Sequence, residues 1–365
     1  MRDPSPLYPV SRRHLDVLTD EVGIIQHAIG SRPDPAHGYC TDDVARALQV
    51  DLLHARELGW ASVADSAWRS IRFLEEAFDA SIGRFRNFRR VDGSWLEGPG
   101  SEDCHGRAIL ALGEAIAEAP DGGMVAAASS LFDRALPAAQ GMAAMRARAS
   151  ALLGCDAAMR AVPTERTADT HRLLASRLGS TFQSRPAQPW PWPEALLTYE
   201  NALPVRALIV AGGYNGSRLM VDAGLNLLDW LIKAQTAPTG HLSPIGNGWW
   251  PRGGGKSRFD QQPIEATALL LAAEAAYLTT GDDRYRVTIE RAYAWFLGEN
   301  DLSAVIVDPA RGAGFDGLTP RGVNTNQGAE STLMWLIALE HVRALRAQRL
   351  DVPSATRRLM VPAAR

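Results

Sequence analysis

The sequence predicts an all-α protein built as an (α/α)6 barrel, in which six helical hairpins form a closed ring. Helical periodicity of the apolar residues recurs in twelve segments along the chain. The odd-numbered segments have a charged face, as helices that face solvent do. The even-numbered segments are rich in alanine and leucine and poor in charge. The segments share no repeat consensus of the kind that marks a helical solenoid.

Clusters of Gly, Pro, Asp and Asn, such as TTGDDR and AGGYNGS, separate the predicted helices. In chain order the helices are expected over 11–29, 41–57, 61–79, 103–119, 122–137, 141–161, 164–182, 199–213, 216–235, 259–280, 283–298 and 326–347. The even-numbered helices would form the inner layer of the barrel, because small side chains allow close packing. Short β-hairpins are expected only in loops at the barrel mouth, for example in GRFRNFRRV around Phe85. We expect residues 1–348 to form one barrel domain and residues 349–365 a C-terminal tail.

Composition and charge argue against several classes of protein. The chain has 365 residues, 46% of them hydrophobic, and a formal net charge of -3. A nucleic-acid partner would favour a basic face, and no apolar run reaches the ~20 residues that span a bilayer. The start of the chain lacks the apolar core of a secretory signal, and its three cysteines lack the spacing of a disulfide framework. We therefore expect a cytoplasmic protein with no nucleic-acid or membrane partner.

Polar residues gather where the inner helices begin. Five of the six inner helices start with such a cluster: CTDDVARA, SEDCHGRA, TYENALPVRA, FDQQPIEATA and NTNQGAESTL. These starts share one face of the barrel, so the clusters would meet at one mouth. Helix capping explains part of the pattern, and Thr41 and Ser101 are the expected N-caps. Capping does not explain acids one turn inside a helix, such as Glu265 and Glu330, or the amides Gln261, Gln262, Asn324, Asn326 and Gln327.

The long connections lead to the same mouth. They are expected over 80–102, 183–198, 236–258 and 299–325, and long loops in a compact domain are usually functional. These loops contain half of the ten tryptophans, namely Trp95, Trp190, Trp192, Trp249 and Trp250. Some of them would pin the loops to the barrel, and the others would offer flat faces on which sugar rings stack. Carboxylates, amides and tryptophans together indicate a neutral, polyhydroxylated ligand.

The stretches GYCTDD, SEDCHGRA, LLTYENA, KSRFDQQPIEA and NTNQGAESTL, in this order, resemble a poorly characterised bacterial family of glycosidase-like proteins, often associated with glycosyltransferases. The chain is also similar to the wider six-hairpin glycosidase group, and the resemblance extends over about residues 37–340. It implies an (α/α)6 barrel, a carbohydrate substrate (an oligosaccharide or a polysaccharide) and a functional link to a glycosyltransferase.

We expect a glycoside hydrolase. Glycoside cleavage needs one carboxylic acid to protonate the leaving oxygen and a second carboxylate to activate water or to attack the sugar. Glu200 or Asp43 is the expected acid, and Asp103 or Asp260 the expected base. Tryptophans in WPWPEALLTY would raise the pKa of Glu200. Adjacent helix residues diverge by about 100°, so only one of the two neighbours Asp42 and Asp43 is expected to face the cavity.

The candidate residues form two sets. The catalytic candidates are Asp42, Asp43, Asp103, Glu200, Asp260 and Glu330. Asp316 is a further acid at the mouth. The candidates for binding sugar hydroxyls or rings are Tyr39, Arg46, His105, Arg107, Trp190, Trp192, Tyr199, Asn201, Trp249, Trp250, Arg258, Gln261, Gln262, Asp316, Asn324, Asn326 and Gln327. We expect neither a cofactor nor a metal.

Several alternatives remain open. A sugar isomerase or epimerase on the same barrel would favour histidine bases, but only His37, His105 and His241 lie in stretches that face the mouth. A glycoside phosphorylase is possible because Lys256 and Arg258 could meet a phosphate. Zinc bound by two cysteines and a histidine, around CHG at 104–106, has only a weak spacing signal. The last alternative is a carbohydrate-binding barrel without catalysis, which the density of acids disfavours.

Overall fold

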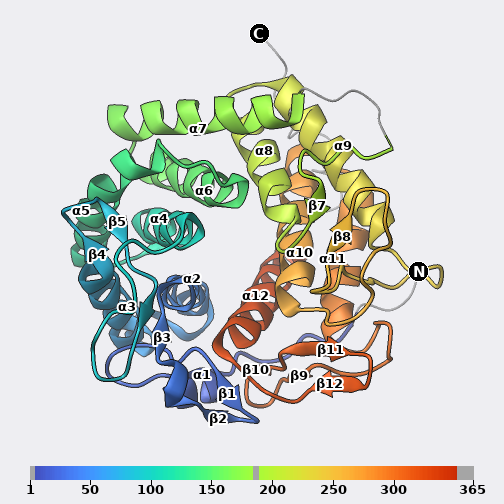
Figure 1. The fold of residues 1–365 in the computed structure, drawn as a ribbon, viewed down its shortest axis with the longest axis horizontal. Helices are drawn as coiled ribbons and strands as arrows, with labels where there is room; N and C mark the ends of the chain where they lie inside the picture. The colour runs from blue at the N-terminus through green and yellow to red at the C-terminus, as the bar shows by residue number, and fades with distance from the viewer. Residues whose placement is uncertain (1–4, 184–188, 352–365) are drawn as a thin grey trace.

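The computed structural model describes residues 5–183 and 189–351, and within them twelve α-helices form an (α/α)6 barrel (Figure 1). The inner layer is formed by α2 (Thr41–Leu58), α4 (Glu102–Glu118), α6 (Met145–Ala161), α8 (Ala202–Tyr214), α10 (Pro263–Thr280) and α12 (Ala329–Asp351). Each inner helix packs on the next, and α12 packs on α2, so the inner ring is closed. The predicted fold class and its inner layer are confirmed.

The outer helices cover this ring. They are α1 (Arg13–Leu18), α3 (Ala64–Ala77), α5 (Gly122–Ala139), α7 (Glu165–Gln183), α9 (Arg218–Ala234) and α11 (Asp283–Phe296). The helices α3, α5, α7, α9 and α11 each pack on the inner helix that precedes them, and the short α1 packs on α12. The amphipathic pattern of the outer helices follows from this position, because one face contacts the inner ring and the other contacts water.

Glycine allows two inner helices to approach each other unusually closely. The pair α4 and α6 has the most extensive contact in the barrel. A Cβ atom added at Gly113 would lie 2.1 Å from the carbonyl oxygen of Gly154, and one added at Gly106 would lie 2.5 Å from that of Ala147. Such distances are too short for any larger side chain, so these glycines determine the spacing of the two helices.

The long connections all enter the inner helices at one end of the barrel, where they form two-stranded pairs. The strands are β1 (Ala28–Ile29), β2 (Arg32–Pro33), β3 (Tyr39–Cys40), β4 (Phe78–Asp79), β5 (Arg84–Phe85), β6 (Phe88–Arg89), β7 (Leu196–Leu197), β8 (Trp250–Pro251), β9 (Val307–Asp308), β10 (Ala313–Gly314), β11 (Gly317–Thr319) and β12 (Gly322–Asn324). The stretch GRFRNFRRV contains β5 and β6, which do not pair with each other. Instead β5 forms a hairpin around Phe85 with the preceding β4, and β6 pairs with β3. This end is the mouth.

The structure corrects two local predictions. The helix expected over 11–29 ends at Leu18, because the Asp20 carboxylate accepts hydrogen bonds from the backbone of Val22 and Gly23 and turns the chain toward β1. Ser101 caps α4 as expected. Thr41 is not a cap, because the chain enters α2 from β3 and its hydroxyl donates to the carbonyl oxygen of Arg86 at 2.7 Å instead.

The last helix, α12, continues to Asp351, and the rest of the predicted tail, 352–365, lies outside the described residues. Among the described helices, none is long and apolar enough to cross a membrane.

Candidate active site

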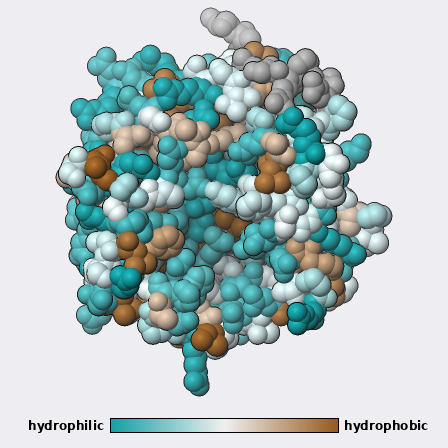
Figure 2. Space-filling view, viewed as in Figure 1, coloured by the Kyte–Doolittle hydropathy of each residue, from teal (hydrophilic) through white to brown (hydrophobic). Residues whose placement is uncertain are grey.

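A cavity of about 320 Å³ opens at the centre of the mouth, where α2, α4 and α12 begin. Carboxylates, arginines and amides line it, and they come from opposite ends of the sequence. In the view along the barrel axis the central hollow is lined mainly by hydrophilic residues (Figure 2). We call this space the mouth cavity.

Arg46 connects two carboxylates at the mouth cavity. Its Nη1 atom lies 2.9 Å from Oδ1 of Asp43, one helical turn earlier on α2, and 3.0 Å from Oε2 of Glu330 on α12. Because both oxygens contact one nitrogen atom, they lie within about 6 Å of each other. The side chain of Asp43 is 4% exposed and that of Glu330 is 38% exposed, so the pair combines a buried and an accessible carboxyl group.

Arg107 on α4 makes a similar bridge beside the first. Its Nη1 lies 3.0 Å from Oδ1 of Asp42, and its Nη2 lies 2.8 Å from Oε2 of Glu200 at the start of α8. The amide of Asn87 also donates to Asp42 at 2.9 Å. Two arginines thus hold four carboxylates from three different stretches of the chain. The charge-assisted contacts fix the directions of all four groups.

Burial gives Asp43 an unusual acidity. It is the largest influence and raises the pKa of Asp43 to about 7. The Arg46 guanidinium opposes this shift, whereas the carboxylates of Glu330 and Asp42 add to it. Asp42 has the opposite shift, because Arg107, Arg46 and hydrogen bonds outweigh its burial and lower its pKa. Near neutral pH, Asp43 therefore exchanges a proton while its neighbour stays ionised.

Both neighbouring aspartates line the mouth cavity, which corrects the expectation that only one of them would. The two residues do diverge around the α2 axis, and they contact different arginines. At the first turn of a helix, however, the cavity surrounds the helix end rather than one of its sides. A divergence of about 100° therefore leaves both carboxyl groups facing the same space.

A second, more polar cavity of about 230 Å³ adjoins the mouth cavity, and Gln262, Asp316 and Asn324 line both. It also contains Asp260, whose φ of 57° is a conformation rarely adopted by residues other than glycine. Asp316 accepts hydrogen bonds at 3.0 Å from the Gly328 backbone and from the Ser331 hydroxyl. The candidates at the starts of α10 and α12 thus extend the site on one side.

Glu200 is held in place by a buried acid, Glu265, that is not among the predicted site residues. Glu265 on α10 accepts hydrogen bonds from the backbone N–H of Glu200 and, at 3.3 Å, from the Asn201 amide. Burial raises the pKa of Glu265 to about 7. Asn201 is itself fully buried and accepts a hydrogen bond from Arg146 at 2.9 Å. Glu265 and Asn201 therefore position the start of α8, where Glu200 adopts a φ of 48°.

Asp103 and Tyr199 form a pair away from both cavities. The Tyr199 hydroxyl donates to Oδ2 of Asp103, and the Arg146 guanidinium lies 4.7 Å from the centre of the tyrosine ring. Arg107 is close enough for the charge of Asp103 to raise the pKa of the arginine. This candidate base is therefore next to the ion-pair network, but its carboxylate already has a hydrogen-bond donor.

Four candidates have side chains that contact the protein interior instead. His105 is buried, its Nε2 lies 3.1 Å from the carbonyl oxygen of Ala135, and burial lowers its pKa to about 4. The buried Gln261 amide hydrogen-bonds Trp295 and Asp301, and the buried Tyr39 hydroxyl donates to Asp20 at 2.6 Å. Gln327 is also buried, and its backbone carbonyl accepts a hydrogen bond from His14. The side chains of Tyr39 and Gln261 therefore stabilise loops, and His105 contacts the outer helix α5.

The tryptophans form their own cluster. Trp190 and Trp192 are buried, and their indole N–H groups donate to Glu194, not to Glu200. Glu200 contacts Arg107 instead, so the expected contact between these tryptophans and Glu200 is absent. Trp250 stacks on Trp230 of α9 with ring centres 5.8 Å apart.

The remaining candidates lie at the rim. Trp249 is 39% exposed and has a φ of 64°. Arg258 contacts Asp301 at 3.1 Å, and the Lys256 ammonium donates to two backbone carbonyl groups. Neither of these cations lines the two mouth cavities. The Asn326 side chain accepts a hydrogen bond from the Gly30 backbone, which ties the segment before α12 to the loop after β1.

Sequence reasoning missed His27, which lines the mouth cavity. Its ring lies 4.6 Å from that of His37, and burial lowers its pKa. The error follows from the overlong first helix, which placed His27 on a helix surface. The turn residues in IGSRPDP immediately after it would have been a signal that this helix ends earlier.

The cysteines and His105 do not face a common point. The Cys40 thiol lies 3.2 Å from Oδ1 of Asn87, the Cys104 thiol lies 3.6 Å from the carbonyl oxygen of Arg86, and His105 contacts Ala135. Burial raises the pKa of both thiols, which disfavours the thiolate form that binds zinc. Within residues 5–183 and 189–351, no three His, Cys, Asp or Glu residues form a metal-binding group.

Comparison with known proteins places the fold. No family model matches the chain, and no curated protein matches its sequence. Among solved structures, it is similar to a D-mannose isomerase (TM-score 0.69, 14% identity, covering 91% of this chain and 94% of that one). It is also similar to the cellobiose 2-epimerase of Bacillus thermoamylovorans (TM-score 0.69, 13% identity, 91% and 98%) and to a GH76 α-mannanase of Bacteroides thetaiotaomicron (TM-score 0.64, 8% identity, 93% and 96%). The structural similarity shows a shared (α/α)6 fold, and at sequence identities this low it shows the fold alone.

Proposed function

We propose that this barrel is a carbohydrate-active enzyme and that it hydrolyses glycosidic bonds at the mouth cavity. The observation that carries the proposal is the pair formed by Asp43 and Glu330 on one guanidinium nitrogen. Both carboxyl groups line one cavity, and the buried one has a pKa near neutrality. The solved structures with this fold are named as enzymes that act on sugars, which supports a carbohydrate substrate.

The proposed roles of Asp43 and Glu330 follow from the burial of the first and the exposure of the second. Asp43 is the proposed general acid, because its raised pKa lets it hold a proton near pH 7 and deliver it to the leaving oxygen. Glu330 is the proposed nucleophile, because its side chain is exposed to the cavity. In the second step Asp43 would take a proton from the water that releases the sugar from Glu330. Arg46 would hold both carboxyl groups in position.

The spacing favours retention of anomeric configuration. Retaining glycosidases hold their carboxyl groups about 5–5.5 Å apart, whereas inverting ones leave about 6.5–9.5 Å for a water molecule. The upper limit of about 6 Å between the two oxygens on Arg46 is closer to the first class. The amides of Gln262 and Asn324 and the carboxylate of Asp316 would hold sugar hydroxyls.

The test is a screen of oligosaccharides and aryl glycosides with product analysis, with and without phosphate. We expect hydrolysis that does not depend on phosphate, and a first-formed product with the anomeric configuration of the substrate in proton NMR spectra. A product with the opposite configuration would refute Glu330 as nucleophile. Sugar phosphate as the product would identify a phosphorylase.

One observation favours a second candidate, a sugar epimerase or isomerase. His27 lines the mouth cavity beside the carboxylates, and its lowered pKa keeps the imidazole neutral and able to accept a proton near pH 7. The two candidates are separated by incubation with free sugars in deuterated water. Deuterium incorporated next to the carbonyl carbon, together with interconversion of sugars, would indicate the second candidate.

A further inference from the structure

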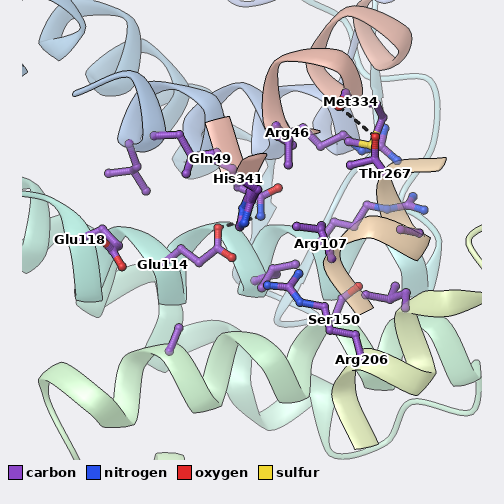
Figure 3. Close-up of a pocket in the computed structure, with 18 of the residues that line it drawn as sticks. Arg46, Gln49, Arg107, Glu114, Glu118, Ser150, Arg206, Thr267, Met334 and His341 are labelled. Atoms are coloured by element: carbon purple, nitrogen blue, oxygen red, sulfur yellow. Dashed lines mark hydrogen bonds between the residues drawn. The ribbon is translucent and has the colours of Figure 1, made fainter. Parts of the chain in front are cut away.

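A separate cavity of about 190 Å³ lies deeper in the barrel, enclosed by the inner helices (Figure 3). The end of this cavity nearest the mouth is formed by residues of the ion-pair network, namely Arg46, Arg107 and Glu200. From there it extends along α2 and α4 to Arg56 and Glu118, near the opposite end of the barrel. We call it the lumen cavity. It is distinct from the mouth cavity and has no role in the proposed hydrolysis.

The walls of the lumen cavity are largely apolar. Leu53, Leu110, Leu203, Leu271 and Ile337 all face it, from five different inner helices. Small-molecule sites in proteins combine such walls with a few polar groups that fix the orientation of the ligand. An aliphatic group that contacts these side chains would lose part of its hydration, beside polar lining residues such as Gln49, Glu114 and Thr267.

One cation in this cavity has no direct contact with a carboxylate. The other arginines that line it have carboxylate partners, for example Arg56 with Glu118 at 2.7 Å and Arg160 with Asp156 at 2.5 Å. Within the described residues, the guanidinium of Arg206 has neither a hydrogen-bond acceptor nor an ion-pair partner. It influences the pKa values of Glu274 and Asp156 only through space.

The Arg206 guanidinium is open to the cavity rather than sealed in the protein. The side chain comes from α8, is half-buried and is among those that face the cavity in Figure 3. None of its nitrogen atoms is among the buried polar atoms that lack a partner, so all of them can be reached from the open space. A partly desolvated cation in apolar surroundings is costly unless an anion neutralises it.

We propose that the lumen cavity binds a small monocarboxylate with a short aliphatic chain, with its carboxylate on Arg206. One free guanidinium supplies one positive charge, and its planar fork matches a carboxylate in a bidentate contact. The leucine and isoleucine side chains contact the aliphatic part. A phosphate dianion would need more positive charge and would leave the apolar walls unused, so the geometry disfavours it.

Isothermal titration of the whole protein with straight-chain monocarboxylates from acetate to octanoate, and with inorganic phosphate, tests this site. We expect the affinity to increase about fourfold per methylene group until the chain fills the cavity. We expect no heat of binding from phosphate. Arg206→Gln should weaken carboxylate binding at least about tenfold. The matched control is Arg218→Gln, since that side chain is 92% exposed on α9, and it should change nothing.

A second variant keeps the test decisive if Arg206→Gln does not fold. Leu271→Phe adds volume to the cavity wall and leaves the charge in place, so it should shorten the longest chain that binds. Carboxylate affinities that do not depend on chain length, or that are equal in the folded Arg206→Gln variant, would overturn the proposal. So would phosphate binding as tightly as the carboxylates, or no carboxylate binding up to about 10 mM.

Discussion

Asp43 and Glu330 contact the same nitrogen atom of Arg46, although they come from the first and the last helix of the inner ring. The contact between α12 and α2 that closes the ring therefore also assembles the carboxyl pair. Fold closure and the candidate chemistry thus depend on the same helix packing.

Replacing the proposed acid should abolish most turnover. Asp43→Asn keeps the shape of the side chain but cannot deliver a proton, so we expect kcat to fall by about 10²–10⁴-fold. Aryl glycosides with a good leaving group should lose less. The control is Asp65→Asn on α3, whose side chain is exposed. Unchanged kinetics on a poor leaving group would remove Asp43 from the mechanism.

The pH profile should have a basic limb set by Asp43. Because only the protonated form can act as acid, kcat/KM should fall about tenfold per pH unit above its pKa of about 7. Glu330 raises the pKa of Asp43, so Glu330→Gln should move it to a lower value. Carboxyl ¹³C NMR titration of the variant measures this directly. An Asp43 pKa that does not change would mean that the two groups are not coupled.

Glu265 should make stability depend on pH. Burial raises its pKa from 4.5 in the unfolded chain to about 7 in the folded protein, so the folded state binds more protons between these values. Stability should therefore decrease as the pH rises through this window. Glu265→Gln removes the cost and should raise the free energy of unfolding by about 1–3 kcal/mol at pH 8. Urea denaturation at pH 4 should show little of this gain, and an equal gain at both pH values would contradict the titration.

The buried and exposed ion pairs should differ in their contribution to stability. Arg107→Met leaves the mostly buried carboxylates of Asp42 and Glu200 without their cation, and we expect a loss of about 3–5 kcal/mol. Adding Glu200→Gln to that variant should restore part of it. The control is Arg56→Met, which removes an exposed pair with Glu118 and should cost at most about 1 kcal/mol. Equal losses in the two single variants would refute the distinction.

Helix spacing is testable through two glycines. Gly113→Ala forces a methyl group against the Gly154 backbone and should destabilise the barrel by about 1–3 kcal/mol. At Gly213 on α8 a Cβ atom meets nothing within 4 Å. There the same substitution should stabilise the protein by up to about 1 kcal/mol. Thermal unfolding of both variants provides the comparison, and a neutral Gly113→Ala would mean that α4 and α6 can move apart.

The architecture could be predicted from the sequence because most inner helices are rich in alanine and leucine and poor in charge along their bodies, whereas the outer helices have one charged face. Periodicity detects this difference directly. The length of the first helix was overestimated, because the apolar pattern from Leu15 to Ile25 continues through a turn. Hydrogen bonds of a side chain create that turn. Pairings between strands of two residues leave no periodic signal, so only the hairpin around Phe85 was expected.

The residue types at the mouth could be predicted from the sequences at the helix starts, but the contacts between their side chains could not. Sequence indicates that Asp43 and Glu330 approach the same end of the barrel, yet nothing in it shows that Arg46 joins them. It also cannot distinguish a side chain that faces the cavity from a neighbour that faces the core. Gln262 lines the mouth cavity, for example, whereas the amide of its neighbour Gln261 is buried and hydrogen-bonds Trp295 and Asp301.

The closed ring has a consequence for biosynthesis. A chain leaving the ribosome exposes α2 long before α12 exists, and during that time the apolar side of α2 that will face α12 has no cover. The pocket that holds Asp43 and Glu330 forms only when translation has passed the last helix. Nascent copies therefore lack the carboxyl pair and expose an apolar surface that favours aggregation until α12 has emerged.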